Sequence, residues 1–197
     1  MQNKKAIIIF TKNPELGKVK TRLARTIGDD KALEIYKKLL DYTRNIVEPV
    51  NVDKFIFYSE TIVDFDKWEN TIYHKKLQSG TDLGMRMQNA FEELFQLHYE
   101  SVCIIGSDCY ELNSEIIEKA FRRLEHEEVV IGPTFDGGYY LLGMNQLYTK
   151  LFQNKNWSTE SVYGDTIGDL KELSLRYFDL EKLSDIDEEK DVPHQWV

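Results

Sequence analysis

The stretch that decides the fold reads KAIIIFTKNPELGKVKTRL and occupies residues 5–23. Its first part, residues 5–11, is a short run rich in β-branched side chains, and a polar loop containing Pro14 and Gly17 follows directly. A continuous apolar run bounded by turn residues is typical of a strand that is buried on both faces of a parallel sheet. The sequence therefore predicts that the first strand of such a sheet ends at Thr11.

Outward from this strand, segments with strand and helix patterns alternate. Apolar runs predict strands at residues 55–58, 72–77, 102–105 and 129–131. Helical spacing predicts helices from Asp29 until Pro49, over residues 83–95 with Asp82 as the cap, and over residues 114–124. This alternation predicts an α/β fold with a mostly parallel sheet covered by helices on both faces. A glycine-flanked strand at residues 137–143 and a late strand at residues 174–178 interrupt the alternation, so we expect a mixed sheet.

The composition fits one soluble domain spanning residues 1–197. Hydrophobic residues make up 42% and charged residues 30% of the chain, and 34 acidic against 25 basic side chains give a net charge of −9. An acidic balance disfavours nucleic acid and anionic membrane surfaces as partners. The apolar run at residues 6–10 is too short to span a membrane. We therefore expect a cytoplasmic protein with no nucleic-acid partner and no membrane span, in which Cys103 and Cys109 are reduced.

The loop after the first strand is unusually basic. Five of the 25 Lys and Arg residues fall within residues 12–25, namely Lys12, Lys18, Lys20, Arg22 and Arg25. Ligands of open α/β sheets bind at the carboxyl ends of the strands, and lysine and arginine side chains neutralise phosphates there. The loop lacks the spacing of a P-loop and the GxGxxG pattern. It is either an anion-binding loop or a solvated basic loop.

A carboxylate follows the strand predicted at residues 102–105. The segment IIGSDCYEL, residues 104–112, places Asp108 at the same edge of the sheet as the basic loop. A divalent cation that takes oxygen ligands often bridges a carboxylate to substrate phosphates, so Asp108 is a candidate metal ligand, with a turn or cap residue as the alternative. Cys109 is a weaker candidate nucleophile because no His stands near it in sequence. The four His residues have no zinc-ligand spacing.

Three further segments are candidates for substrate contacts. The segment GPTFDGGYYLLG, residues 132–143, has four glycines around Asp136, and residues 79–84 form a similar glycine-containing turn. Such glycines allow a close approach of backbone to ligand or form a structural turn. Trp157, Ser158 and Thr159 suit a sugar face, although Trp157 is equally suited to the core. The segment LSDID, residues 183–187, offers two carboxylates that could complete a metal site begun by Asp108.

Taken together, these motifs resemble one family. They are FTKNPELGKVKTRLA at residues 10–24, GTDLGMRM at 80–87, GSDC at 106–109, GPTFDGGYYL at 132–141 and WST at 157–159. In this order they resemble the bacterial glycosyltransferase-like, or selenodomain-associated transferase, family of the nucleotide-diphospho-sugar transferase superfamily. The chain is also similar, more distantly, to the phospholactate guanylyltransferases and the molybdenum cofactor guanylyltransferases.

The resemblance implies a GT-A type, Rossmann-like three-layer sandwich that binds a nucleotide over the first loop. It implies a divalent metal, Mg²⁺ or Mn²⁺, held by Asp108 with help from Asp187. The residues expected to bind the nucleotide are Thr11, Lys12, Pro14, Gly17, Lys18, Lys20, Arg22, Gly80 and Asp82. The residues expected at the substrate or acceptor are Gly137, Gly138, Tyr139, Trp157 and Ser158. Asp136 is expected to act with Asp108 in catalysis, as a general base or a group that orients a hydroxyl.

The expected activity is transfer from a nucleotide sugar to a small-molecule acceptor. The nearest alternative is a nucleotidylyltransferase, similar to the guanylyltransferases, which would release pyrophosphate from the same site. A non-catalytic nucleotide-binding protein is a further alternative. A phosphatase with an aspartate nucleophile is disfavoured, because Thr11-Lys12-Asn13 stands where that class has its two aspartates.

Overall fold

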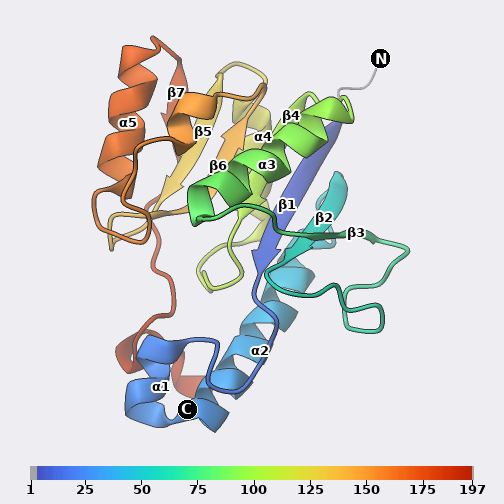
Figure 1. Ribbon diagram of the computed structural model, residues 1–197, viewed down its shortest axis with the longest axis vertical. Helices are drawn as coiled ribbons and strands as arrows, with labels where there is room; N and C mark the ends of the chain where they lie inside the picture. The colour runs from blue at the N-terminus through green and yellow to red at the C-terminus, as the bar shows by residue number, and fades with distance from the viewer. Residues whose placement is uncertain (1–3, 197) are drawn as a thin grey trace.

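The computed structural model describes residues 4–196 and has one seven-stranded sheet with helices on both faces (Figure 1). The strands are β1 (Lys5–Thr11), β2 (Asp53–Tyr58), β3 (Tyr73–Leu77), β4 (Ser101–Ile105), β5 (Val129–Pro133), β6 (Tyr139–Met144) and β7 (Tyr177–Asp179). The α-helices are α1 (Thr21–Ile27), α2 (Asp29–Val47), α3 (Leu83–Gln96), α4 (Ser114–Arg123) and α5 (Val162–Glu172). Short 3-10 helices are η1 (Thr149–Phe152), η2 (Glu189–Asp191) and η3 (His194–Trp196).

The strand order is β3-β2-β1-β4-β6-β5-β7. Only β6 runs against its neighbours, pairing antiparallel with β4 and β5, while β1 pairs parallel with both β2 and β4. The mostly parallel mixed sheet is therefore confirmed. Because the parallel strands share a direction, β1 and β4 both end at the edge where α1 lies (Figure 1).

Alternation of side chains along each strand divides the core into two large clusters. On one face, Ile7, Ile9 and Cys103 pack with residues of α2 and α4, and on the other, Ala6, Ile8 and Val102 pack with residues of α3 and α5. This is the expected three-layer sandwich. The buried positions Ile7, Ile8 and Ile9 explain the continuous apolar run in the sequence, since neighbouring side chains enter opposite clusters.

A third, smaller cluster joins α1 to α2 and to the end of the chain. Its six buried residues are Leu23, Ala32, Ile35, Leu39, Ile186 and Val192. Figure 1 shows α1, the start of α2 and the C-terminal residues together at one end of the molecule, beyond the carboxyl end of β1. This cluster brings residues 183–187 to the edge of the sheet.

Three elements differ from the sequence prediction. The second half of the basic loop forms α1, which begins at Thr21 and whose N-cap residue, Lys20, makes no side-chain capping bond, so capping signals could not reveal it. The late strand begins at Tyr177, because α5, which the sequence pattern did not predict, extends to Glu172 and Ser174 adopts a φ of 56° in the turn after it. Among residues 4–196, no helix is both long and apolar enough to cross a membrane.

Candidate functional site

Tyr36 fixes the start of the basic loop at the end of β1. Its hydroxyl accepts a hydrogen bond from the Lys12 backbone N–H at 2.9 Å and lies 3.1 Å from Thr11 Oγ1. It also lies 3.3 Å from Ser107 Oγ, in the turn after β4. Burial raises the pKa of the Tyr36 phenol, which keeps it a neutral hydrogen-bonding group. The loop after β1 and the turn that carries Asp108 are thus held together by one side chain of α2.

Asn13 fixes the next part of the loop. Its side-chain amide donates to the Thr61 carbonyl at 2.8 Å, and its side-chain oxygen accepts from the Glu60 N–H at 3.0 Å. The side chain is buried, and these bonds satisfy its donor and acceptor groups. Sequence reasoning did not select Tyr36 or Asn13; a polar residue directly after a buried strand was the available signal for Asn13.

Lys20 is the centre of the site. Its Nζ lies 2.9 Å from Asp108 Oδ2 and 3.3 Å from Asp187 Oδ1, and only 6% of its side chain is exposed. Burial by itself would lower the pKa of this ammonium, but the carboxylates of Asp108 and Asp187 outweigh burial and raise it. Lys20 is therefore charged at neutral pH. Two aspartates 79 positions apart in the sequence meet at its ammonium group.

Asp108 lies in the turn after β4, as the sequence predicted. Burial acts to raise the pKa of its carboxyl, and the charges of Lys20 and Lys12 overcome burial and hold that pKa below its ordinary value. The Asp108 carbonyl accepts a hydrogen bond from the Ile186 N–H at 3.0 Å. This backbone bond places the C-terminal segment against the turn and brings Asp187 to Lys20.

Asp185 adds a third carboxylate to this group. Its Oδ1 atom is buried and has no hydrogen-bond partner within the described part of the chain. Burial, followed by the negative charges of Asp108, Asp136 and Asp187, raises the pKa of Asp185 to about 8. The sequence indicated the segment that holds Asp185, and the resemblance implied Asp187 as a metal ligand, a role that stays a prediction; which of the two carboxylates is buried cannot be read from the sequence.

Asp136 belongs to a glycine turn next to these carboxylates. Its Oδ1 accepts hydrogen bonds from Thr134 Oγ1 and from the Gly138 N–H, which leaves Oδ2 for other partners. Gly137 has a φ of +90°, and a Cβ built on it would lie 2.1 Å from the Glu160 carbonyl oxygen. The Gly137 carbonyl in turn accepts from the Tyr163 N–H at 2.9 Å. The turn therefore requires glycine in order to hold residues 160–163 against it.

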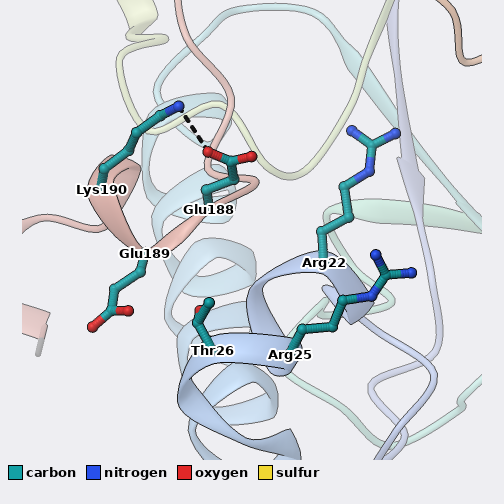
Figure 2. A pocket seen from close by; sticks show the side chains of 6 residues that line it. All are labelled: Arg22, Arg25, Thr26, Glu188, Glu189 and Lys190. Atoms are coloured by element: carbon teal, nitrogen blue, oxygen red, sulfur yellow. Dashed lines mark ion pairs between the residues drawn. The ribbon is translucent and has the colours of Figure 1, made fainter.

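Arg22 extends the site toward a surface pocket. Its Nη1 lies 3.2 Å from Asp187 Oδ2 on the exposed side of that carboxylate. The pocket has a volume of about 740 Å³ and lies between α1 and the η2 turn. Figure 2 shows the guanidinium groups of Arg22 and Arg25 extending from α1 in the same direction, away from Glu189. Its lining residues are Arg22, Arg25, Thr26, Glu188, Glu189 and Lys190.

Other predicted residues lie in structural roles or away from the carboxylates. Lys18 pairs with Glu15 at 2.7 Å and with Glu60 at 3.4 Å, in the exposed part of the loop that also contains Pro14 and Gly17. Asp82 caps α3 by accepting from the Met85 N–H at 2.9 Å. The Gly80 carbonyl accepts from Arg86 Nε at 3.2 Å. These contacts do not test nucleotide binding, so that role stays a prediction.

The aromatic residues predicted at the substrate pack on α3. A Cβ on Gly84 would lie 2.3 Å from Trp157 Nε1, so the indole lies directly on the first turn of that helix. The Tyr139 hydroxyl is 3.9 Å from Met87 Sδ, while Ser158 is exposed with a φ of 64°. This packing is the core alternative that the sequence left open for Trp157. A contact of these residues with substrate stays a prediction.

The carboxylates have the donor chemistry of a Mg²⁺ or Mn²⁺ site. Asp108, Asp185 and Asp187 offer only oxygen ligands, which these cations prefer, and Asp185 Oδ1 has no protein partner. However, residues 4–196 contain no group of three or more His, Cys, Asp or Glu side chains already arranged to hold a metal. Two of the carboxylates are turned toward the Lys20 ammonium instead. The donor set has the chemistry of a divalent-cation site, and in this structure the Lys20 ammonium pairs with two of its carboxylates.

Comparison with solved structures supports the fold. A protein from Desulfovibrio desulfuricans G20 named "putative nucleotide-diphospho-sugar transferase" is 32% identical, with 93% of this chain and 82% of that chain covered and a TM-score of 0.87. A 4-diphosphocytidyl-2C-methyl-D-erythritol synthase from Anaerococcus prevotii DSM 20548 is 13% identical, with 96% and 92% covered and a TM-score of 0.63. The inositol-1-phosphate CTP transferase from T. maritima is 11% identical, with 98% and 93% covered and a TM-score of 0.55. The last two likenesses show the fold alone.

Sequence comparison gives the family. No protein with a curated description is similar enough in sequence to count as a relative. A family model matches residues 44–159, which is more than half of the chain and includes Asp108, Asp136 and the glycine turn. With this match, and with a relative 32% identical over nearly the whole chain, the protein belongs to the family described as "uncharacterized protein conserved in bacteria (DUF2064)".

Proposed function

We propose that this protein is a transferase that uses a nucleotide-activated donor, a nucleotide sugar, and a small-molecule acceptor. The observation that carries the proposal is the junction of the basic loop with Asp108 and Asp187 at the carboxyl edge of the sheet, through Lys20. In open α/β sheets this edge is where ligands bind. The name of the Desulfovibrio desulfuricans relative supports a nucleotide-diphospho-sugar donor.

In this proposal the cationic side chains bind the diphosphate. Lys12, Lys20 and Arg22 would donate charge-assisted hydrogen bonds to its oxygens, since all three come from the loop after β1 and the start of α1. Asp108 and Asp187 would hold Mg²⁺ or Mn²⁺, whose charge would help to neutralise the diphosphate as it leaves.

Asp136 would act on the acceptor. Its Oδ1 is used by the turn, but Oδ2 is available to accept the proton of an acceptor hydroxyl. The hydroxyl oxygen would then attack the anomeric carbon, and the bond from that carbon to the phosphate oxygen would break. The electron pair of that bond stays with the nucleoside diphosphate, and the proton stays on Asp136.

A nucleotidylyltransferase is the second candidate. Two observations favour a reaction at phosphorus. The cationic groups gather around Lys20, where they would stabilise charge on a phosphate, and Asp136 Oδ1 is already used by its own turn. The fold likeness to the 4-diphosphocytidyl-2C-methyl-D-erythritol synthase is compatible with this activity. In that reaction an acceptor phosphate attacks the α-phosphorus of a nucleoside triphosphate, and pyrophosphate leaves.

Product analysis separates the two activities. Purified protein is incubated with Mn²⁺ or Mg²⁺ and either a panel of nucleotide sugars or a panel of nucleoside triphosphates with sugar phosphates, and the products are followed by phosphorus NMR. We expect release of nucleoside diphosphate from one nucleotide sugar, lost in Asp108→Asn. Glu93→Gln serves as the control, because Glu93 also pairs with a lysine, Lys76 at 2.7 Å, and is also 39% exposed, but lies on α3.

The other outcomes are equally informative. Pyrophosphate release without consumption of any nucleotide sugar would establish the nucleotidylyltransferase instead. Nucleotide binding in a thermal-shift panel without any turnover would favour a non-catalytic nucleotide-binding protein. Activity that survives Asp108→Asn would remove the carboxylate group from the mechanism.

A further inference from the structure

The Lys20 ammonium lies between two carboxylates of the candidate site. The ammonium is within 3.3 Å of carboxylate oxygens of both Asp108 and Asp187, and the side chain is 6% exposed. Arg22 contacts the other oxygen of Asp187 from the exposed side. Asp108 Oδ2 and Asp187 Oδ1, which pair with Lys20, are carboxylate oxygens of the kind that a divalent cation prefers as ligands.

The backbone at Lys20 shows that this position is held firmly. Its φ of 48° and ψ of 44° lie in the left-handed region, which is unfavourable for a residue with a side chain. The neighbouring residue Val19 is buried, and the Lys20 carbonyl accepts from the Ala24 N–H at 2.8 Å in the first turn of α1. These contacts fix a backbone conformation that sends the side chain to Asp108.

The Lys20 ammonium brings one positive charge to two carboxylates, Asp108 and Asp187, and Asp187 also pairs with Arg22. Oδ1 of the neighbouring Asp185 has no hydrogen bond within residues 4–196. One positive charge is less than a divalent cation would supply to the same oxygens. A cation of higher charge would therefore be attracted to this group, but the ammonium and the metal cannot share the same oxygens.

We propose that Lys20 is an internal cation that competes with the divalent metal, so that metal binds only when the Lys20 ammonium leaves Asp108 and Asp187. The phosphates of a nucleotide give the displaced ammonium a new partner. Metal and nucleotide then bind cooperatively, because each removes the obstacle to the other. The part of this inference that concerns nucleotide rests on the proposed function; the competition between lysine and metal does not.

Mn²⁺ binding without nucleotide tests the competition directly. Free Mn²⁺ is measured by electron paramagnetic resonance in titrations of the wild type, Lys20→Met and Lys20→Gly. Both variants remove the ammonium, and glycine also relieves the left-handed backbone. We expect both to bind one Mn²⁺ about tenfold more tightly than the wild type or better, since loss of one neighbouring positive charge is worth at least about 1.4 kcal/mol at a buried site.

Two further variants identify the site of the bound Mn²⁺. Asp108→Asn in the Lys20→Met background should abolish the gain. Lys75→Met is the matched control, because Lys75 is another lysine with a buried side chain, 7% exposed and 2.8 Å from Asp66, but its ammonium has only that one carboxylate. Its loss should leave Mn²⁺ affinity unchanged. An equal gain in Lys75→Met would mean that net charge, not displacement, controls the affinity.

A measurement on the wild type keeps the inference falsifiable if a variant fails to fold. Saturating Mn²⁺ should increase the rate at which acetic anhydride labels Lys20, with Lys75 as the internal reference in the same mass spectra. Unchanged labelling of Lys20, or Mn²⁺ affinity in folded Lys20→Met and Lys20→Gly equal to or weaker than that of the wild type, would overturn the inference. Because neither measurement uses nucleotide or turnover, failure of the proposed function would leave these results readable.

Discussion

At the scale of single residues, burial and neighbouring charges give chemically identical side chains of the site different pKa values. Asp108 and Asp185 have the same chemistry, yet the pKa of Asp108 is lowered by Lys20 against the effect of burial, whereas burial and neighbouring negative charge raise that of Asp185 to about 8. The first carboxyl is charged at neutral pH and the second is partly protonated. This difference follows from the position of one ammonium group and gives a pH dependence that can be measured.

Asp185 should make the protein less stable as pH rises toward 8. The folded state binds the proton of Asp185 up to about pH 8, while the unfolded chain releases it near the ordinary pKa of about 4. The free energy of unfolding therefore decreases with rising pH between these values, by at most about 1.4 kcal/mol per pH unit from this group. Urea denaturation at pH 5 and pH 8 should show the decrease, and Asp185→Asn should reduce it. An unaltered slope in this variant would mean that Asp185 is already ionised at pH 5.

Arg22 should contribute to nucleotide binding through its exposed guanidinium. Removing a charge-assisted hydrogen bond to phosphate costs about 1.5–3 kcal/mol, so Arg22→Ala should raise the dissociation constant roughly 10- to 100-fold. Calorimetric titration with the nucleoside diphosphate that gives the largest thermal shift is the measurement. Arg122→Ala is the control, since both arginine side chains are 62% exposed and both pair with a carboxylate, but Arg122 lies on α4. Equal affinity in the two variants would exclude Arg22 from the binding site.

At the scale of elements, the turns after the strands supply the candidate site residues, and the strands and helices hold these turns in place. The loop after β1 supplies Lys20, the turn after β4 supplies Asp108, and the turn between β5 and β6 supplies Asp136. The bridge between Thr134 and Leu183 leads the C-terminal segment along the last of these turns. Each turn therefore depends on contacts with another turn, which makes their packing testable by substitution.

Gly137→Ala should be strongly destabilising, whereas Gly164→Ala should not. At Gly137 a Cβ meets the Glu160 carbonyl at 2.1 Å and the φ of +90° is unfavourable, so a loss of roughly 2–5 kcal/mol in the free energy of unfolding is expected. At Gly164, inside α5, a Cβ has no neighbour within 4 Å, and alanine should add about 0.5–1 kcal/mol. Chemical denaturation of both variants measures the difference. A mild effect at Gly137 would mean that residues 160–163 move away from the turn at little cost.

At the scale of the whole molecule, the site lies between two parts of unequal size. Two large clusters hold the helices to the sheet, and the cluster of six buried residues holds α1 and the C-terminal segment. Lys20 and Arg22 belong to the smaller part, and Asp108 belongs to the sheet. Local opening free energies fall with the amount of buried apolar contact. Lys20 and Arg22, which we propose to bind phosphate, are thus attached to the less stable side.

Hydrogen exchange should reveal this division. The backbone amides of α1 (Thr21–Ile27) and of residues 184–192 are expected to exchange faster than those of β1 and β4, because opening them exposes only the small cluster. Mass spectrometry of peptide fragments measures the rates. A nucleotide that joins Lys20 to the sheet should slow exchange in α1. Equal protection of α1 and β1 without ligand would show that the protein opens only as a unit.

The amino-acid sequence by itself determined the fold class, because the run at residues 5–11 and the alternation of apolar patterns after it are local properties that reflect burial on both faces of a sheet. It also indicated Lys20, Asp108 and Asp187 as site residues, since charged groups directly after buried strands gather at one edge; their roles stay predictions. Only the tertiary structure decided that α1 begins directly after Lys20 and that the Lys20 ammonium lies between those carboxylates. The same holds for Asp185 and Trp157, which nothing in the sequence distinguishes from other aspartates and tryptophans. The pKa of Asp185 and the packing of Trp157 depend on neighbours distant in sequence. Burial and charge pairing are properties of the packed chain, and no pattern within a short segment contains them.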